Sequence, residues 1–274
     1  MQAEIPMANI IEVQHLTKKF GDFEAVKDVS FSVEEGGIFA FLGPNGAGKS
    51  TTIKMLTTLL QPTSGTIRID GHDPITEADA VRHSFGIVFQ DPSLDEDLTA
   101  WENLEFHGLL YDVPGDIRRQ RIDELLALVE LSDRRRSFVR EFSGGMKRRL
   151  EIARGLLHHP KIIFLDEPTL GLDPQTRNHL WSYVRKLNES AGITVFFTTH
   201  YMEEADRVAR RIAIIDRGRI IAAGSSMELK QKTNTDSLED AFLALTGSEI
   251  REEAGSTLDT MRQARRMWHG GRNR

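Results

Sequence analysis

An α/β fold with a parallel sheet at its core is predicted by short apolar runs that alternate with helical stretches. The runs at 38–42 and 162–165 are continuously apolar, as expected for strands buried on both faces, and 194–198 is rich in apolar and β-branched residues. A helical pattern at 176–188 separates the last two runs and stops at Gly192. Strands that alternate with helices imply a parallel sheet covered on both faces.

The N-terminal part of the chain predicts an antiparallel β subdomain beside this core. Apolar and polar residues alternate at 29–33 and again at 66–70, which is typical of strands with one solvated face. A third strand is expected at 10–13, and Gly21-Asp22 marks a turn that follows it.

The middle of the chain predicts an inserted α-helical subdomain at about 91–155. The pattern is helical from about 98 to 158, with the clearest helices at 124–129 and 147–157. Further short elements are expected as strands at 87–89 and 212–215 and as a helix at 203–208.

Composition restricts what the chain can be. Its 274 residues and 30.9 kDa allow one large domain or two small ones. A net charge of −6 at pH 7 argues against nucleic acid as a main partner, and the absence of cysteine excludes disulfides, thiolate-bound zinc and cysteine nucleophiles. The absence of cysteine also suits a reducing cytosol. We find neither a run of about 20 apolar residues nor a secretory signal in residues 1–9, which we expect to form a flexible arm.

Residues 43–51 fit the phosphate-loop pattern G-x-x-x-x-G-K-[ST]. Glycines let backbone N–H groups approach a polyphosphate, Lys49 can reach the β- and γ-phosphates, and the Ser50 hydroxyl can ligate Mg²⁺. The order of strand, glycine loop and helix favours this interpretation over a chance glycine-rich turn, and it predicts a P-loop NTPase (RecA-like) core. The expected nucleotide-binding residues here are Gly43, Pro44, Asn45, Gly46, Ala47, Gly48, Lys49, Ser50 and Thr51.

Two carboxylates follow the apolar run at 162–165. An acid at the C-terminal end of such a strand lies where α/β folds bind ligands. Asp166 is placed to ligate Mg²⁺, and Glu167 is placed to accept a proton from an attacking water. A charged turn after a core strand is the alternative, and the phosphate loop makes it the weaker one.

A second anion-binding element is suggested by Ser143-Gly144-Gly145, just before a helix. Ser143 is a good N-cap, and the glycines leave backbone N–H groups open to an anion. On local grounds a plain helix cap explains Ser143 equally well. The occurrence of this loop together with the phosphate loop favours the anion site.

With these motifs the chain resembles the ATP-binding subunits of ABC transporters, over roughly residues 10–245. The resemblance implies ATP and Mg²⁺ as cofactors, separate integral-membrane permease subunits as partners, and a head-to-tail dimer of two copies that sandwiches ATP. In that dimer Ser143 and Gly145 of one subunit contact the γ-phosphate held by Lys49 of the other. It also implies an ATPase domain at 10–225, followed by a helical extension and tail at 226–274.

The resemblance assigns further site residues. Phe20 matches the aromatic residue that stacks on adenine, although a core position at a strand end is its alternative. Gln90 matches the glutamine that senses Mg²⁺ and the membrane partner, Asp173 belongs to the loop that communicates across the dimer, and His200 matches the histidine that contacts the γ-phosphate. Together with Glu167 and Lys49, Gln90 and His200 are the expected catalytic residues, and Ser50, Gln90 and Asp166 the expected Mg²⁺ ligands.

Two positions depart from the family pattern. Met146 replaces the usual final glutamine of the second loop, and Gly37 replaces the usual glutamate before the phosphate-loop strand. Neither change touches the phosphate chemistry, so we expect an active ATPase.

Segments at 89–95, 199–206 and 238–247 resemble the ATPases of daunorubicin-type drug-resistance exporters. This closer likeness implies export of a drug or lipid-like small molecule, by a protein bound peripherally to the cytoplasmic face of a bacterial inner membrane. An ABC ATPase that regulates a membrane or cytosolic complex without moving cargo stays an open alternative. A different phosphate-loop enzyme, such as a kinase or GTPase, is disfavoured, because no guanine-reading Asn-Lys-x-Asp motif is present and the Ser143-Gly144-Gly145 loop counts against it.

Basic runs occur at 118–121, 134–136 and 147–149, and an arginine-rich tail covers 248–274. A solvated helical face with salt bridges is the favoured interpretation of the runs, and contact with anionic headgroups or a permease is the alternative. We expect the tail to be a partly helical extension.

Overall fold

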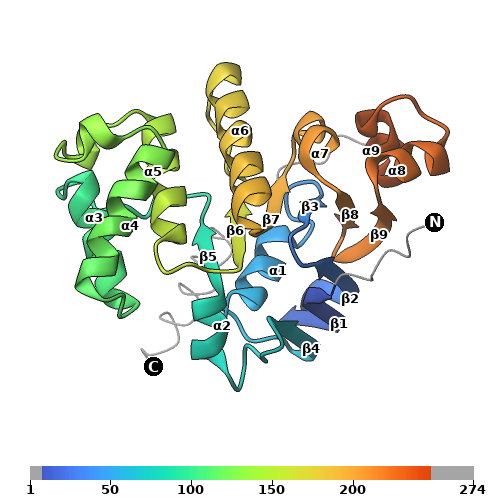
Figure 1. Ribbon diagram of the computed structural model, residues 1–274. Coiled ribbons are helices and arrows are strands. Elements are labelled where there is room, and N and C mark those ends of the chain that lie inside the picture. Colours follow the sequence, from blue (N-terminus) through green and yellow to red (C-terminus); the bar gives the residue numbers. More distant parts are fainter. Residues whose placement is uncertain (1–7, 248–274) are drawn as a thin grey trace, which may run out of the picture.

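A six-stranded sheet lies at the centre of the structure, a computed structural model that describes residues 8–247. Residues 1–7 of the expected arm and the tail at 248–274 lie outside the described residues. The strand order is β5-β6-β7-β3-β8-β9, and only the β8–β9 pair is antiparallel (Figure 1). These strands are β3 (Ile38–Leu42), β5 (Phe85–Val88), β6 (Ile162–Asp166), β7 (Thr194–Thr199), β8 (Arg211–Asp216) and β9 (Arg219–Gly224).

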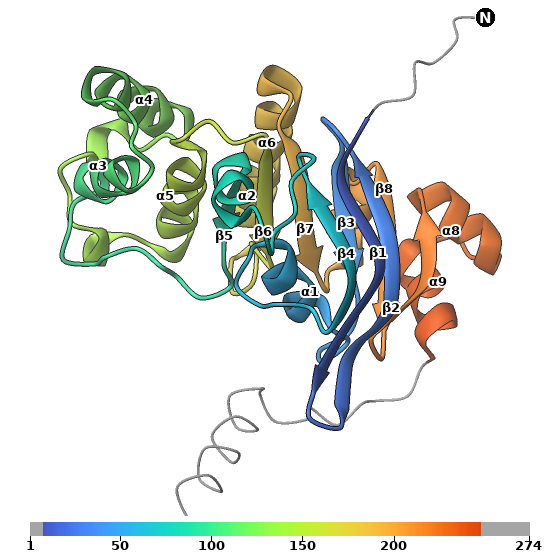
Figure 2. The same ribbon diagram turned by 90° about the horizontal axis from the view of Figure 1, so that it is seen from below.

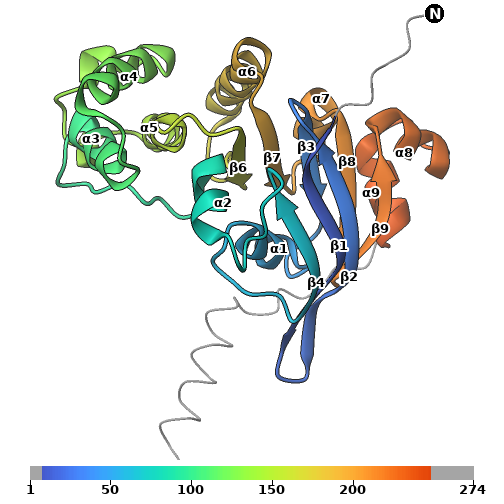
Figure 3. The same ribbon diagram turned by 60° about the horizontal axis from the view of Figure 1, so that its bottom comes forward.

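One face of this sheet is covered by a smaller antiparallel sheet and two helices. The strands β1 (Asn9–Phe20), β2 (Phe23–Glu34) and β4 (Ser64–Ile69) pair in the order β2-β1-β4. Figures 2 and 3 show α1 (Lys49–Leu56) lying between this sheet and α2 (Ala78–Ser84). Alternate residues of β3 point to opposite faces, so Phe39 and Phe41 join this first core, where Phe31 of β2 stacks on Phe39 with 5.6 Å between ring centroids.

The opposite face of the large sheet is covered by helices. Ile38 and Leu42 of β3 pack there against α6 (Pro174–Ala191) and α7 (Met202–Val208), with Trp181 fully buried. Two C-terminal helices, α8 (Ser226–Thr233) and α9 (Leu238–Thr246), add Leu229 and Leu238 to the same core.

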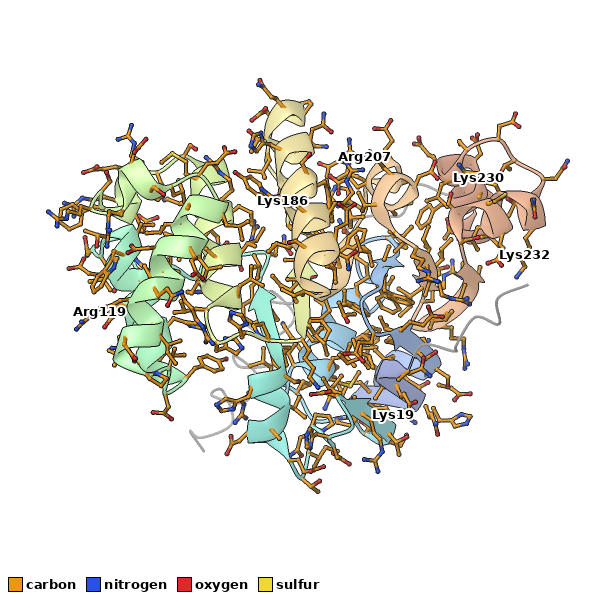
Figure 4. All side chains as sticks on the ribbon, in the orientation of Figure 1. Lys19, Arg119, Lys186, Arg207, Lys230 and Lys232 are labelled. Carbon is orange, nitrogen blue, oxygen red and sulfur yellow. The ribbon has the colours of Figure 1, made fainter. Side chains whose placement is uncertain are left out.

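An ion pair also joins α8 to α7. Lys230, labelled on α8 in Figure 4, lies with its Nζ 2.8 Å from an oxygen of Asp206 on α7. The extension is therefore packed onto the helix that follows His200.

A helical lobe with its own core projects from the edge of the sheet at β5. It comprises α3 (Ala100–Leu110), α4 (Gly115–Leu128) and α5 (Gly144–Leu156), seen in green at the left of Figure 1. Thr99 and Glu102 form a capping box that fixes the start of α3. The apolar core of the lobe includes Leu104, Ile122, Leu126, Leu150 and Leu157.

The predicted fold class is confirmed, with the parallel core, the antiparallel sheet and the helical insertion all present. The first two strands are longer than predicted, because several register shifts along the β1–β2 pair interrupt the alternation that marks a strand in sequence. The helix α2 and the strand β9 were not predicted. Within the described part of the chain, no helix has the length and apolar character that crossing a membrane requires.

The basic runs are largely ion-paired on the surface of the lobe. Arg118 contacts Glu105 at 2.7 Å, and Arg135 contacts Asp123 at 3.1 Å. Arg119 projects outward from the lobe in Figure 4. The run at 147–149 departs from the expected solvated face, because Arg148 is buried.

Candidate functional site: a phosphate loop and its carboxylates

The phosphate loop connects the central strand β3 to α1. Its backbone requires glycine at two positions, because a Cβ atom on Gly43 would lie 2.4 Å from the carbonyl oxygen of Ile215 and one on Gly48 would lie 2.7 Å from that of Ala25. Gly48 is also left-handed, with φ of 110°, and supplies no side-chain cap to α1. The N–H groups at the start of α1, where Lys49, Ser50 and Thr51 lie, are therefore available to an anion.

Lys49 is buried beside its own loop. Its Nζ donates a hydrogen bond to the carbonyl oxygen of Gly43 at 2.7 Å and lies 3.3 Å from that of Pro44. The same Nζ lies 3.3 Å from Oε1 of Glu167. The loop carbonyls thus hold the ammonium group of Lys49 in place, and only 5% of the Lys49 side chain is exposed.

Asp166 ends β6 next to Thr198 of β7. Its Oδ1 accepts a hydrogen bond from the Thr198 hydroxyl at 2.6 Å, and 6% of the residue is exposed. Burial raises the pKa of Asp166, while hydrogen bonds from the Thr198 and Ser50 hydroxyls act in the opposite direction. Asp166 and Ser50 therefore meet, as the sequence predicts for Mg²⁺ ligands.

Glu167 turns away from the strand into the site. Its φ is 48°, in the left-handed region, and its backbone N–H donates to the Thr198 hydroxyl at 2.9 Å. The carboxylate then lies between two partners, Lys49 at Oε1 and Nδ1 of His200 at 3.1 Å from Oε2. Three of the four residues that the sequence predicts to be catalytic are thus brought together.

The donor set fits Mg²⁺ bound mainly by phosphate oxygens. Ser50, Asp166 and Gln90 offer one hydroxyl, one carboxylate and one amide, and Mg²⁺ prefers oxygen ligands while retaining water. Within residues 8–247 there is no group of three or more His, Cys, Asp or Glu residues that could hold a metal by itself. A site completed by a nucleotide matches this arrangement.

Phe20 and Gln90 come from other elements, and within residues 8–247 no hydrogen bond or ion pair joins either of them to Lys49, Asp166 or Glu167. Phe20 is 39% exposed at the β1–β2 turn, where Lys18 Nζ lies 5.1 Å from its ring centroid. Gln90 follows β5, and its carbonyl oxygen accepts a hydrogen bond from Arg148 at 3.0 Å.

Ser143, Gly144 and Gly145 open α5 in the helical lobe, where Ser143 caps the helix by accepting from the N–H of Met146. Asp173 caps α6, accepting from the N–H groups of Gln175 and Thr176. In the described part of the chain, no hydrogen bond or ion pair given by the structure links these four residues to Lys49, Asp166 or Glu167.

Two functional features were missed by the sequence reasoning. Thr198 holds both Asp166 and the backbone of Glu167, and the only hint was a pair of threonines directly before His200. Glu204, buried on α7, accepts hydrogen bonds from Thr169 and Thr199, both at 3.0 Å. These contacts tie the strand ends that carry Glu167 and His200 to one helix.

A phosphate loop on the central strand of a parallel sheet, with a carboxylate ending the strand two places along, defines a P-loop nucleotide hydrolase. Residues 26–170 match the family described as ABC transporter. The chain therefore belongs to the ABC transporter family, and it is an ATP-binding and ATP-hydrolysing subunit of that family.

Known relatives agree over most of the chain. It is 45% identical to the daunorubicin resistance ATP-binding protein DrrA3 of Streptomyces coeruleorubidus, over 92% of this chain and 81% of that protein. It is 41% identical to the linearmycin resistance ATP-binding protein LnrL of Bacillus subtilis, over 89% of this chain and 76% of that protein.

Solved structures show the same fold. An ATP-binding subunit of an ABC transporter has a TM-score of 0.78 and 31% identity, covering 86% of this chain and 99% of its own. A dimeric ATP-binding cassette in a post-hydrolysis state with bound ADP and Pi has a TM-score of 0.70 and 32% identity. The match covers 78% of this chain and 98% of that chain. The predicted family and its likeness to drug-resistance ATPases are confirmed, and nothing found favours a regulator that moves no cargo.

Proposed function

We propose that this chain powers the export of a drug-like or lipid-like small molecule through separate membrane permease subunits. It would act as a peripheral protein on the cytoplasmic face of a bacterial inner membrane. The drug-resistance relatives support the cargo class. The observation that carries the ATPase function is the Glu167 carboxylate held between Lys49 and His200.

The nucleotide would lie along the phosphate loop, with the β- and γ-phosphates on the N–H groups of residues 43–51 and on Lys49. Phe20 would stack on adenine, which suits its exposed ring. Mg²⁺ held by Ser50, Asp166 and Gln90 would neutralise charge that develops on the phosphates.

Hydrolysis would proceed by attack of a water on the γ-phosphorus. As the new P–O bond forms, the bond to the β-phosphate oxygen breaks, and the water proton passes to the Glu167 carboxylate. Lys49 would stabilise the charge on the departing ADP, and His200 would hold Glu167 in place and contact the γ-phosphate.

Each site would be completed by a second copy of the chain, head to tail. The Ser143–Gly145 loop lies at the start of α5, where Ser143 caps the helix. Among residues 8–247, no hydrogen bond or ion pair joins this loop to Lys49 or Glu167 of the same subunit. A loop with open N–H groups at a helix start suits the γ-phosphate of the partner's site. The dimeric relative supports such an assembly, and Asp173 would lie in the segment that faces the partner.

We also propose the domain limits that the sequence suggests. Residues 10–225 would form the ATPase domain with the insertion at about 91–155, and the chain from 226 onward would form the extension.

The test is a pull-down from detergent-solubilised membranes with the Glu167→Gln variant, ATP and Mg²⁺. We expect recovery of a multi-span membrane protein, and ATP-dependent cargo flux when it is reconstituted in vesicles with the unmodified chain. Recovery of soluble partners alone, or a permease complex without flux, would contradict the transport function. Lys49→Ala, which should not bind ATP, is the control for nucleotide dependence.

A further inference from the structure

An ion pair is buried on α5, outside the residues assigned to the nucleotide. Nη1 of Arg148 lies 3.0 Å from Oε2 of Glu151, one helical turn further on. Only 6% of Arg148 and 1% of Glu151 are exposed. Burial lowers the pKa of Arg148, and the Glu151 carboxylate acts in the opposite direction. Because well-packed apolar residues often stabilise a fold as well as a buried ion pair does, stability alone does not explain this one.

The pair holds the backbone of the segment that carries Gln90. Arg148 donates hydrogen bonds to the carbonyl oxygens of Phe89 and Gln90, the latter at 3.0 Å. Glu151 accepts one from the N–H of Ser93 at 2.8 Å. Residues 89–93 belong to no helix or strand, so their backbone groups depend on partners of this kind.

The same helix begins at the Ser143–Gly145 loop. Ser143 caps α5, and Arg148 lies five residues later, about 7.5 Å along the helix axis at 1.5 Å per residue. A continuous helix is stiff over this length. The loop at the start of α5 and the Gln90 segment are therefore joined through a rigid element and a set of buried hydrogen bonds.

We propose that Arg148 and Glu151 are positioning residues that lock the Gln90 segment to the Ser143–Gly145 loop, so that both move as one unit. The inference rests on the proposed head-to-tail dimer. There, Gln90 belongs to the subunit's own ATP site and the loop belongs to the partner's. A shift of Gln90 on nucleotide binding is then transmitted along α5 to the opposite site, which makes hydrolysis cooperative.

The test is the double variant Arg148→Met/Glu151→Met, which removes both charges and their hydrogen bonds and keeps apolar bulk in the core. We expect kcat to fall about tenfold, because Gln90 is no longer held in place. The Mn²⁺ concentration for half-saturation of the ATP complex, measured by electron paramagnetic resonance, should rise about tenfold. The Hill coefficient for ATP should approach one, while metal-free ATP affinity stays within about twofold.

The matched control is Lys147→Met on the same helix. Lys147 pairs with Glu96 at 2.5 Å, and Glu96 is exposed. Within the described chain, no hydrogen bond or ion pair of these two side chains reaches residues 89–93. This variant should keep the parental kcat, Mn²⁺ affinity and Hill coefficient.

Parental kcat, Mn²⁺ affinity and cooperativity in the double Met variant would overturn the inference. Circular dichroism and thermal melting establish whether that variant folds. If it does not, Arg148→Lys decides, because lysine keeps the charge but lacks the planar fork that reaches two carbonyls. A folded lysine variant with lowered kcat and weakened Mn²⁺ binding supports the lock, and parental values reject it. If the unmodified chain neither dimerises nor shows cooperativity, the dimer proposal fails. The change in Mn²⁺ affinity then still tests whether Arg148 and Glu151 hold the Gln90 segment in place.

Discussion

Lys49 and Glu167 lie 3.3 Å apart, Nζ to Oε1, although one opens α1 and the other follows β6. The contact is made in a nearly buried setting, with 5% and 11% of the two side chains exposed. On its other side Glu167 meets His200. The residue proposed as general base is therefore held by a cation at the start of α1 and by a ring nitrogen of the residue that directly follows β7.

The first prediction concerns Glu167 itself. The variant Glu167→Gln keeps the side-chain size but cannot accept the proton of the attacking water. We expect phosphate release to slow at least about 100-fold, in line with the contribution of a general base, while ATP binding persists. Single-turnover phosphate release and equilibrium binding of a fluorescent ATP analogue measure the two properties separately.

Glu203→Gln is the control, because Glu203 is an exposed carboxylate in the first turn of α7. It should hydrolyse ATP at the parental rate. Parental turnover in Glu167→Gln would show that another group takes the proton.

The second prediction uses a close contact between α5 and α6. A Cβ atom on Gly145 would lie 2.5 Å from Cγ2 of Thr176. Gly145→Ala should therefore lower the free energy of unfolding by about 1–3 kcal/mol, the usual cost of overpacking. Adding Thr176→Ser removes that methyl group and keeps the hydroxyl, so the double variant should recover most of the loss. Urea denaturation measures all three proteins.

The neighbouring Gly144 provides the control for this contact. There, the nearest atom to an added Cβ is Cδ2 of Leu172 at 3.8 Å, an ordinary van der Waals distance. Gly144→Ala should fold with nearly parental stability. If Thr176→Ser fails to restore Gly145→Ala, the cost arises elsewhere than at the Thr176 methyl group.

Local chemistry explains which parts of the site could be predicted from sequence. The phosphate loop and Asp166 are short motifs attached to strands with an unmistakable apolar pattern, so their position at one edge of a parallel sheet follows from topology. Thr198 could not be assigned in the same way. Its role depends on register, since it pairs with Asp166 across β6 and β7, and no local pattern encodes that neighbour.

Arg148 was misjudged for a related reason. It lies in a run of three basic residues, which is typical of a solvated surface. On a helix, however, three successive residues point in directions about 100° apart, so they cannot all share one exposed face. The side chain that turns inward was identified only by the carbonyl oxygens that it meets in the folded chain.

The last prediction concerns pH and two half-buried histidines, His107 on α3 and His158 just after α5. Burial lowers the pKa of His107 to about 3, with the charges of Arg154 and His158 acting in the same direction. Burial likewise lowers the pKa of His158 to about 4, although its hydrogen bond with the Phe85 carbonyl opposes this. The ring of Tyr111 stacks on His158 with 3.9 Å between centroids and holds the cluster together.

Both histidines are neutral in the folded chain, whereas in the unfolded chain they take up protons below about pH 6.5. The unfolded state then binds more protons, so stability is lost as the pH falls from about 6.5, by up to about 1.4 kcal/mol per pH unit for each histidine. In His107→Phe one of these protonation sites is gone, and a buried nitrogen without a hydrogen-bond partner, Nε2, is removed with it. Urea denaturation at pH 7.5 and pH 5.0 should therefore show a smaller loss of stability in the variant than in the parent. Parallel losses in the two proteins would mean that His107 does not stay neutral in the folded chain as its surroundings indicate.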